Sequence, residues 1–383
     1  MKWSLKALLW AVACCLMTAQ ADAQSLFTGP LGDPWKLKDS QGFDYGGWVQ
    51  VGVQDLNDGA FTGNGFAQNQ NEANNLNLNQ LYAYVANVAD GSAGIDFGFR
   101  VDGMYGVDGN EAQAFGNITP GKWDYLNGFG GVGDPVDHGP YEFAMPQAYG
   151  EVAVGDLSVK VGHFYTPIGY EVVTSPNNFF LSRQLTFYNS EPFTHTGIMG
   201  TYKVSDDLSV VSGWTAGWDT GFTRFNDGSN GVGGFTAQLT ENINLAWYGA
   251  AGNFGWRGDG AISSGILTVN LTDRLTSVSQ LDWLDTNLGS SGNAGFATTG
   301  ITNNSVGAIQ YFFYTLTDRV SLGSRVEWYK ADGISYQTYT GGINWKVTPN
   351  FIVRPEVRRN DSNGDANDLF NRTVLGVDGI VTF

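Results

Sequence analysis

The amino-acid sequence predicts an all-β protein, a transmembrane antiparallel up-and-down β-barrel of about 16 strands with short periplasmic turns and long external loops. The first observation is composition: 53 of the 383 residues are glycine, 14% are aromatic and only 15% are charged. Average proteins contain about 7% glycine and about 25% charged residues. The second observation is a period-two alternation of apolar and polar residues. The third is a series of tight polar turns that alternate with longer polar segments.

The N-terminal residues 1–24 are predicted to be a secretory signal peptide. Lys2 and Lys6 give the positively charged start, the run 7–17 is apolar, and Ala21-Asp22-Ala23 forms a small-x-small cleavage site. A membrane-spanning helix needs about 20 apolar residues, so this run is too short to span a bilayer. The mean hydropathy of −0.17 also does not fit a helical membrane protein.

After the signal peptide, we expect residues 25–42 to form a short periplasmic segment and residues 43–383 to form the barrel. Both cysteines, Cys14 and Cys15, lie in the predicted signal, so disulfides are not expected to stabilise the mature protein. The net charge is −17, which argues against nucleic acid as a partner because phosphate binding requires a basic surface.

The strands are predicted from runs in which side chains alternate between two faces. One face of such a run carries Phe97, Phe99 and Val101, and the opposite face carries Asp96 and Arg100. Sixteen runs of this kind are expected near 43–55, 76–88, 94–104, 143–154, 157–165, 194–204, 208–218, 230–240, 243–255, 261–271, 275–286, 304–316, 320–331, 336–348, 350–360 and 371–383. Fourteen to eighteen strands are compatible with the pattern.

Alternation alone also fits a soluble β-sandwich, and the turns favour the barrel. A tight polar turn recurs around five marker residues: Asp206, Glu241, Asp273, Asp318 and Pro349. Longer segments rich in Gly, Asn, Asp and Ser lie between these turns, at Asn57–Asn75, Thr286–Asn303 and Asp361–Asn371. Outer-membrane barrels show this asymmetry, with short turns in the periplasm and long loops outside. The terminal aromatic Phe383 resembles the signal by which such barrels are recognised for assembly.

Charged residues on the polar faces of the strands are expected to line a water-filled lumen. A charge that faces lipid costs about 2–4 kcal/mol at mid-depth, so these side chains should point inward. The candidates are Arg100, Lys160, Arg325, Glu327, Arg354, Glu356 and Arg358. Alternatively, these charges only pair with one another and brace the wall.

The segment 166–193 is expected to fold into the lumen and to narrow it. It shows no alternation of its own and carries too many aromatic residues for a solvated loop. Its only charged residues, Glu171, Arg183 and Glu191, are therefore candidates for the pore constriction. The alternative is an external cap that packs on neighbouring loops.

The sequence around this segment resembles the beta-barrel porin-2 family of the OmpL-like type. The resemblance is carried by a strand end followed by a Pro-Gly-Glu element, an Asn-aromatic stretch with Ser, and a Pro–Gly return. These elements are Pro167, Gly169 and Glu171, then Asn178, Phe179 and Ser182, then Pro192 and Gly197. The resemblance implies a porin-like outer-membrane protein and supplies no catalytic residues.

No catalytic or cofactor motif accompanies these features. The three histidines are His138, His163 and His195, and they show no metal-ligand spacing. We therefore expect no enzyme activity, no metal and no cofactor. Two alternatives stay open: a hydrolase that uses His163 and His195, and calcium in the acidic segment 361–368.

The predicted function is passive diffusion of small hydrophilic solutes through the lumen of an outer-membrane porin. The alternatives are a structural or adhesive barrel with a plugged lumen and an outer-membrane hydrolase. The expected partners are outer-membrane lipid, the barrel assembly machinery and small hydrophilic solutes, and a homotrimer is one option for assembly.

Overall fold

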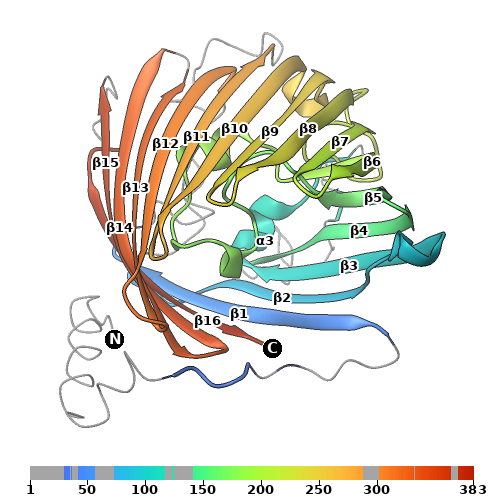
Figure 1. The fold of residues 1–383 in the computed structure, drawn as a ribbon. Helices are drawn as coiled ribbons and strands as arrows, with labels where there is room; N and C mark the ends of the chain where they lie inside the picture. The colour runs from blue at the N-terminus through green and yellow to red at the C-terminus, as the bar shows by residue number, and fades with distance from the viewer. Residues whose placement is uncertain are drawn as a thin grey trace, which may run out of the picture.

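The computed structural model describes residues 30–34, 36, 42–56, 73–116, 123–124, 141–287, 302–331, 333–363 and 370–383. Sixteen strands in these residues form one closed antiparallel barrel (Figure 1). Each strand pairs with its neighbours in sequence, and β1 closes the barrel against β16. In that closing pair Val49 lies opposite Val381, and Gln54 lies opposite Gly376. The predicted up-and-down barrel with 16 strands is confirmed.

The strands follow the predicted order. The first eight are β1 (Asp44–Gln54), β2 (Asn77–Asn87), β3 (Asp96–Gly106), β4 (Glu142–Val154), β5 (Leu157–Tyr165), β6 (Thr194–Ser205), β7 (Leu208–Thr215) and β8 (Ser229–Thr240). The second eight are β9 (Ile243–Asn253), β10 (Asp259–Thr272), β11 (Leu275–Thr286), β12 (Asn304–Thr315), β13 (Val320–Ala331), β14 (Ile334–Thr348), β15 (Phe351–Asn363) and β16 (Thr373–Thr382).

Helices in the described residues are short and lie in the connections between strands. They are η2 (Gly91–Ala93), α3 (Val107–Ala112), η3 (Ser175–Asn177), α4 (Leu185–Ser190) and η4 (Gly255–Arg257). Among the residues that the structure describes, no helix combines the length and the apolar character needed to span a bilayer. Helix α3 lies inside the ring of strands (Figure 1).

The alternation in the sequence separates the two faces of the wall. In β13, Val326 and Trp328 are exposed on the outer face, whereas Arg325 and Glu327 are fully buried on the inner face. A strand places successive side chains on opposite faces, so one strand can present an apolar surface to lipid and a polar surface to the lumen. Buried apolar clusters also form inside the barrel, for example where Phe180 packs with Ile309 and Tyr311.

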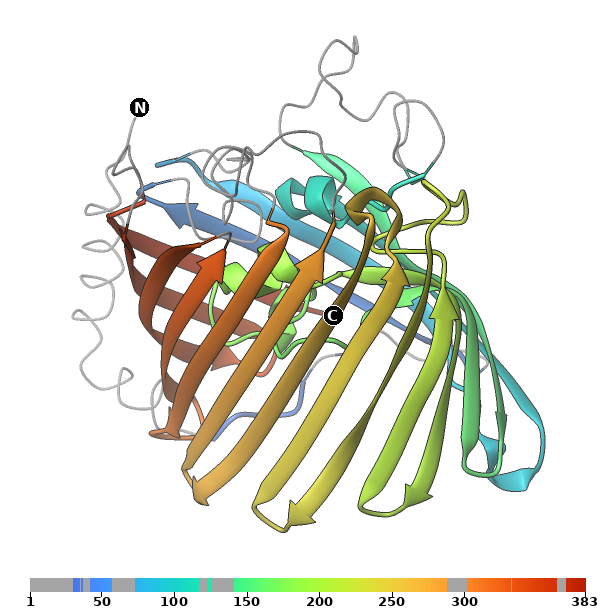
Figure 2. The ribbon, with the colours of Figure 1, turned by 90° about the horizontal axis from the view of Figure 1, so that it is seen from above.

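The short turns gather at one end of the barrel, which we call the short-turn end (Figure 2). The five predicted marker residues each lie in a tight connection between consecutive strands, as predicted: Asp206, Glu241, Asp273, Asp318 and Pro349. At the opposite end most connections are longer, but 254–258 and 332–333 are short. The predicted long loops 57–75 and 286–303 fall mostly outside the described residues.

Some strand ends differ from the prediction because tertiary contacts decide them. We expect β7 to reach position 218, but it ends at Thr215. Beyond it the backbone turns away from the sheet at Gly217, which has a φ of +126°, and the Trp218 amide donates to the Phe254 carbonyl over 3.0 Å. Strand β15 runs to Asn363, three residues beyond its predicted end, so positions 361–363 belong to a strand rather than to a loop.

Cysteine labelling can test which end of the barrel faces the periplasm. Asp227, between β7 and β8, and Asp273, between β10 and β11, lie in connections at opposite ends of the barrel, and both are exposed. We expect a cysteine at position 227 to react with an impermeant maleimide on intact cells, and a cysteine at position 273 to react only after the outer membrane is permeabilised. Equal labelling of both variants on intact cells would contradict this orientation.

The C-terminal residue takes part in barrel closure. The backbones of Gly47 and Phe383 exchange two hydrogen bonds of 3.0 Å, which extend the pairing of β1 with β16. A lipid-exposed sheet edge leaves backbone groups without hydrogen bonds, so loss of this pair should weaken closure. We expect deletion of Phe383 to lower the amount of folded, heat-modifiable protein in the outer membrane. Unchanged levels would argue against a role for Phe383 in assembly.

Candidate functional site

Segment 166–193, which we call the inward segment, crosses the interior of the barrel. The chain leaves the wall after β5, returns to it at β6, and contacts β13 in between. Because β13 is eight strands from β5 in either direction around the ring of sixteen, the segment reaches the opposite wall. It contains η3 and α4, and it lies within the ring in Figure 1. The alternative of an external cap is therefore not what the structure shows for this segment.

A buried ion pair fastens the inward segment to β13. Arg325 donates to Glu171 over 2.6 Å, and the two side chains are 0% and 4% exposed. Arg325 also donates to the carbonyl and the hydroxyl of Ser182, over 3.0 and 2.9 Å, and the hydroxyl of Tyr311 donates to Glu171 over 3.0 Å. Removing one member of a buried pair leaves the other charge buried without its partner, so a single substitution at either position should weaken this contact strongly.

Wall carboxylates accept backbone amides of the inward segment. Glu327 accepts from the amide of Leu185 over 2.9 Å and from the amide of Thr186 over 2.8 Å. Glu356 accepts from the amide of Ser182 over 3.1 Å. These are charge-assisted hydrogen bonds to main-chain donors, and they fix the path of the backbone rather than one side chain.

Wall arginines bind carbonyl groups of the same segment. Arg354 pairs with Asp378 through a 2.9 Å hydrogen bond from Nε, and its Nη1 donates to the carbonyls of Ser175 and Asn178 over 3.1 and 2.6 Å. Arg358 donates to the carbonyl of Arg183 over 2.9 Å. The predicted inner-wall charges on β13 and β15 therefore all contact the inward segment, and they are at most 8% exposed.

Glycines on the inner wall make room for side chains of the inward segment. A Cβ atom added at Gly323 would lie 2.3 Å from Cε1 of Phe179, and one added at Gly307 would lie 2.3 Å from Oγ1 of Thr186. At Gly342 the added atom would lie 3.2 Å from Cε1 of Phe180. Glycine thus has a local role here: at these positions the inner face of the wall carries no side chain, and side chains of the inward segment occupy the space.

The structure places the three predicted constriction residues in buried contacts. Arg183 is 0% exposed, and it donates to the carbonyls of Phe180 and Leu181 over 3.0 Å each. Glu191 is 1% exposed and accepts from Gln280 over 2.6 Å, and burial raises the pKa of this carboxyl well above its ordinary value. Their effect on permeating ions stays a prediction, as does that of Glu171.

The two remaining lumen candidates lie on other strands of the wall, β3 and β5. On β3, Arg100 donates through Nε to Asp102 over 2.8 Å. On β5, the Lys160 ammonium lies 4.8 Å from the centre of the Tyr149 ring. A lumen-lining role for both residues stays a prediction.

Sequence reasoning missed the contribution of β2 and α3. Gln80 on β2 donates both to the carboxylate of Asp108 in α3 and to the carbonyl of Val173 in the inward segment, each over 2.8 Å. Burial raises the pKa of Asp108 to about 7. The position of Gln80 on the polar face of β2 was the available signal, but a single glutamine does not stand out among many polar inner-face residues.

The two histidines of the hydrolase alternative are buried and bound to threonines. Nδ1 of His163 lies 2.7 Å from Oγ1 of Thr196, and Nε2 of His195 lies 3.0 Å from Oγ1 of Thr166. Their exposures are 0% and 1%. A hydrolytic base must reach a substrate, and these imidazoles are enclosed. Within the described ranges, no group of three or more His, Cys, Asp or Glu residues is placed to hold a metal ion.

Comparison with solved structures shows the same fold at low sequence identity. The outer-membrane channel DcaP of Acinetobacter baumannii superposes with a TM-score of 0.59 at 9% identity, over 91% of this chain and 99% of that one. A mutant of the porin from Rh. blastica gives 0.54 at 14% identity, over 89% and 100%. An engineered protein from work on asymmetric conductivity gives 0.55 at 14% identity, over 89% and 100%.

A search of curated proteins finds no match to this chain. The family described as "Putative beta-barrel porin-2, OmpL-like" matches residues 42–383, which span the whole barrel. The family and the fold are those of an outer-membrane channel rather than of an enzyme. With its sixteen-strand barrel and polar inner wall, the chain belongs to this family of outer-membrane porins.

Proposed function

We propose that this porin lets small hydrophilic solutes diffuse passively across the outer membrane. The observation that carries the proposal is the closed barrel of sixteen strands with charged residues on its inner face. Barrels of about eight strands are filled by their own side chains, whereas barrels of 16–18 strands leave an aqueous channel. In passive diffusion the solutes move down their own concentration gradient, and no energy source drives them.

The inward segment acts in this proposal as a fixed constriction. Its hydrogen bonds and ion pair to β13 and β15 hold both its backbone and its side chains against the wall. A segment held by many buried contacts should not open and close on its own, so it sets the size limit of the channel. Glu171, Arg183 and Glu191 contribute to this limit by holding the segment in place.

A structural barrel with a plugged lumen is the second candidate. The observation that favours it is that α3 and the inward segment both lie inside the ring, and that the inward segment buries inner-wall charges such as Arg325 and Glu327. In this alternative the same contacts would serve stability alone.

The partners follow from an outer-membrane location. We propose that outer-membrane lipid contacts the exposed apolar residues of the wall, and that the barrel assembly machinery recognises the last strand with Phe383. We also propose that the protein forms a homotrimer. We further propose that residues 25–42 lie in the periplasm, and a hydrogen bond at the short-turn end supports this location: Arg319 donates to the carbonyl of Pro30 over 2.7 Å. The proposal includes no catalytic role for His163 or His195.

Conductance in planar lipid bilayers tests the proposed function. We expect the purified, refolded protein to give discrete, ohmic current steps in potassium chloride without a voltage threshold. Liposomes that contain the protein should swell in small neutral solutes at rates that fall as solute size rises. Folded, heat-modifiable protein that inserts but conducts no current and admits no solute would support the plugged barrel instead.

A further inference from the structure

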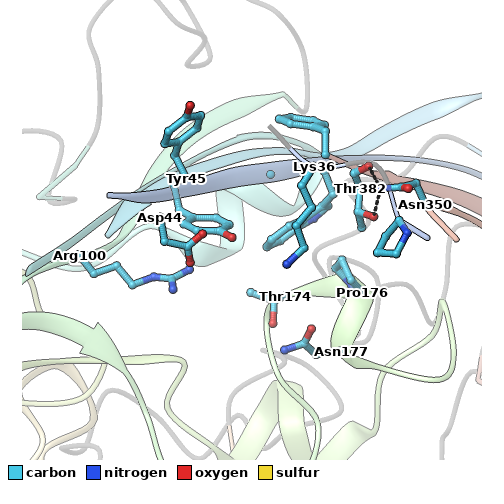
Figure 3. A pocket seen from close by; sticks show the side chains of 14 residues that line it. Lys36, Asp44, Tyr45, Arg100, Thr174, Pro176, Asn177, Asn350 and Thr382 are labelled. Carbon is cyan, nitrogen blue, oxygen red and sulfur yellow. Dashed lines mark hydrogen bonds between the residues drawn. The ribbon is translucent and has the colours of Figure 1, made fainter. Parts of the chain in front are cut away.

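A hollow of about 360 Å³ lies inside the barrel near the short-turn end. Its lining comes from β1 to β3, from the end of β16, and from η3 of the inward segment (Figure 3). Thr174, Pro176 and Asn177 form the side that the inward segment contributes. The hollow is thus bounded on one side by the wall and on the other by the proposed constriction.

Arg100 presents an incompletely satisfied guanidinium to this hollow. Its Nε donates to both carboxylate oxygens of Asp102, over 2.8 and 3.1 Å, and its Cζ lies 4.5 Å from the centre of the Tyr84 ring. Its two terminal nitrogens have no hydrogen-bond acceptor in the described part of the chain, and the side chain is 27% exposed. A guanidinium whose Nε is hydrogen-bonded, and whose two Nη atoms are not, offers two parallel N–H donors (a fork) that can bind both oxygens of a carboxylate.

A second cation faces the same space. Lys36, from the segment that precedes the barrel, points toward Thr174 and Asn177 in Figure 3. Neither Lys36 nor the one acidic side chain of the lining, Asp44, forms a hydrogen bond or an ion pair with another described residue. Among the lining side chains, two are therefore cationic and one is anionic.

Neutral hydrogen-bonding groups and aromatic rings complete the lining. Asn177 and Thr174 lie on the inward segment, and the aromatic rings are those of Tyr84 on β2 and Trp48 on β1. Sites for small organic molecules combine apolar rings with a few placed polar groups that fix orientation. The composition of this hollow therefore suits a small solute that carries one charge and additional hydroxyl groups.

We propose that this hollow is a binding site for small organic carboxylates, in which Arg100 and Lys36 hold the carboxylate and the amide and hydroxyl groups bind the remainder. The inference rests on the proposed diffusion function, because it names the class of solute that the channel would favour. Asp44 limits the site to anions of low charge, since a second carboxylate would meet its negative charge. A neutral solute would not use the free guanidinium.

Equilibrium binding tests the site without reference to permeation. Isothermal titration of the folded protein in detergent with lactate should show saturable binding. Replacing Arg100 with Gln should weaken that binding about tenfold or more, because charge-assisted hydrogen bonds are lost. The matched control is Lys203→Gln, which removes a lysine from an exposed ion pair with Asp206 and should leave the affinity unchanged.

Two further variants keep the test independent of folding effects at Arg100. Arg100→Lys keeps the charge but loses the fork, so its affinity for lactate should fall between those of the wild type and Arg100→Gln. Asp44→Asn removes the opposing charge and should strengthen lactate binding several-fold. Heat-modifiable migration of each variant confirms that the barrel is folded.

Alanine provides the sharpest comparison, because it replaces the hydroxyl group of lactate with an ammonium group. We expect lactate to bind more tightly than alanine. Tighter binding of alanine, weakened by Asp44→Asn, would replace the proposed anion site with a site for zwitterions. Equal affinity of the wild type and Arg100→Gln for lactate would overturn the proposal.

Flux measurements separate this inference from the proposed function. In liposome swelling, the ratio of lactate entry to glycerol entry should fall in Arg100→Gln and stay constant in Lys203→Gln. Lactate binding that depends on Arg100, in a protein that passes neither solute, would uphold the site and refute the diffusion function. Passage of both solutes without binding, at a ratio that Arg100→Gln does not change, would refute the site and uphold the function.

Discussion

Replacing Glu171 with Gln should release the inward segment from the far wall and raise the single-channel conductance of the protein. The substitution leaves Arg325, which is 0% exposed, buried without its carboxylate partner. Breaking a buried pair in this way costs about 3–5 kcal/mol. That cost lowers the ratio of docked to undocked segment by roughly a hundredfold or more. The sixteen strands should still close, because the substitution lies outside them.

Two measurements report the release of the segment. Conductance in planar bilayers should rise and should show larger fluctuations than in the wild type. Trypsin should also cleave after Arg183, which is 0% exposed and is the only basic residue in positions 166–193. A product cut at this site can be identified by mass.

The control for Glu171→Gln is Asp206→Asn. Asp206 pairs with Lys203 over 2.7 Å, but the two side chains are 92% and 51% exposed. Exposed ion pairs contribute only about 0–1 kcal/mol, so this variant should match the wild type in conductance and in resistance to trypsin. If Glu171→Gln also matches the wild type in both measurements, the buried pair does not hold the segment.

Replacing Gly323 with Leu should displace the inward segment by filling the space that Phe179 occupies. Even a single Cβ atom at this position would lie 2.3 Å from Cε1 of Phe179, and three further carbon atoms cannot fit without movement. The Phe179 ring also packs on Phe180 and Phe313, with ring centres 4.9 and 5.0 Å apart, so the displacement spreads. Overpacking of this kind costs about 1–3 kcal/mol. We expect higher conductance and faster cleavage by trypsin at Arg183.

Gly341 provides the matched control for Gly323. It lies on the adjacent strand β14, and a Cβ atom added there would have no neighbouring atom within 4 Å. Gly341→Leu introduces the same side chain on the outer face of the neighbouring strand, beside exposed Tyr339 and Ile343, so it should leave the inward segment in place. Equal behaviour of the two leucine variants would show that the gap at Gly323 has no part in docking.

The strands and the tight turns follow from the sequence because both depend on local chemistry. Strands predicted at 275–286 and 320–331 are found at Leu275–Thr286 and Val320–Ala331. Alternation marks a strand within a few residues, and a polar pair such as Asp273-Arg274 between apolar strand ends marks a turn. Neither signal requires knowledge of the rest of the chain.

Where long-range contacts compete with local pattern, the sequence alone is not sufficient. The alternation near Trp218 continues that of β7, yet the structure ends this strand at Thr215, because the amide of Trp218 bonds to Phe254 in a later connection. A local pattern cannot report a hydrogen-bond partner that lies 36 residues away, as the interval from 218 to 254 shows. Short helices such as α4 within the inward segment were missed for the same reason.

The sequence by itself predicted that this chain forms a porin-like barrel, where most strands lie, and that the candidate charges of β13 and β15 face inward. Only the tertiary structure decided which inner charge meets which part of the inward segment. Glu171 and Arg325 are 154 residues apart in sequence. They meet because closure of sixteen strands places β13 across from β5, where the segment leaves the wall. Strand periodicity sets the direction of a side chain, whereas the position of its partner depends on how many strands close the ring.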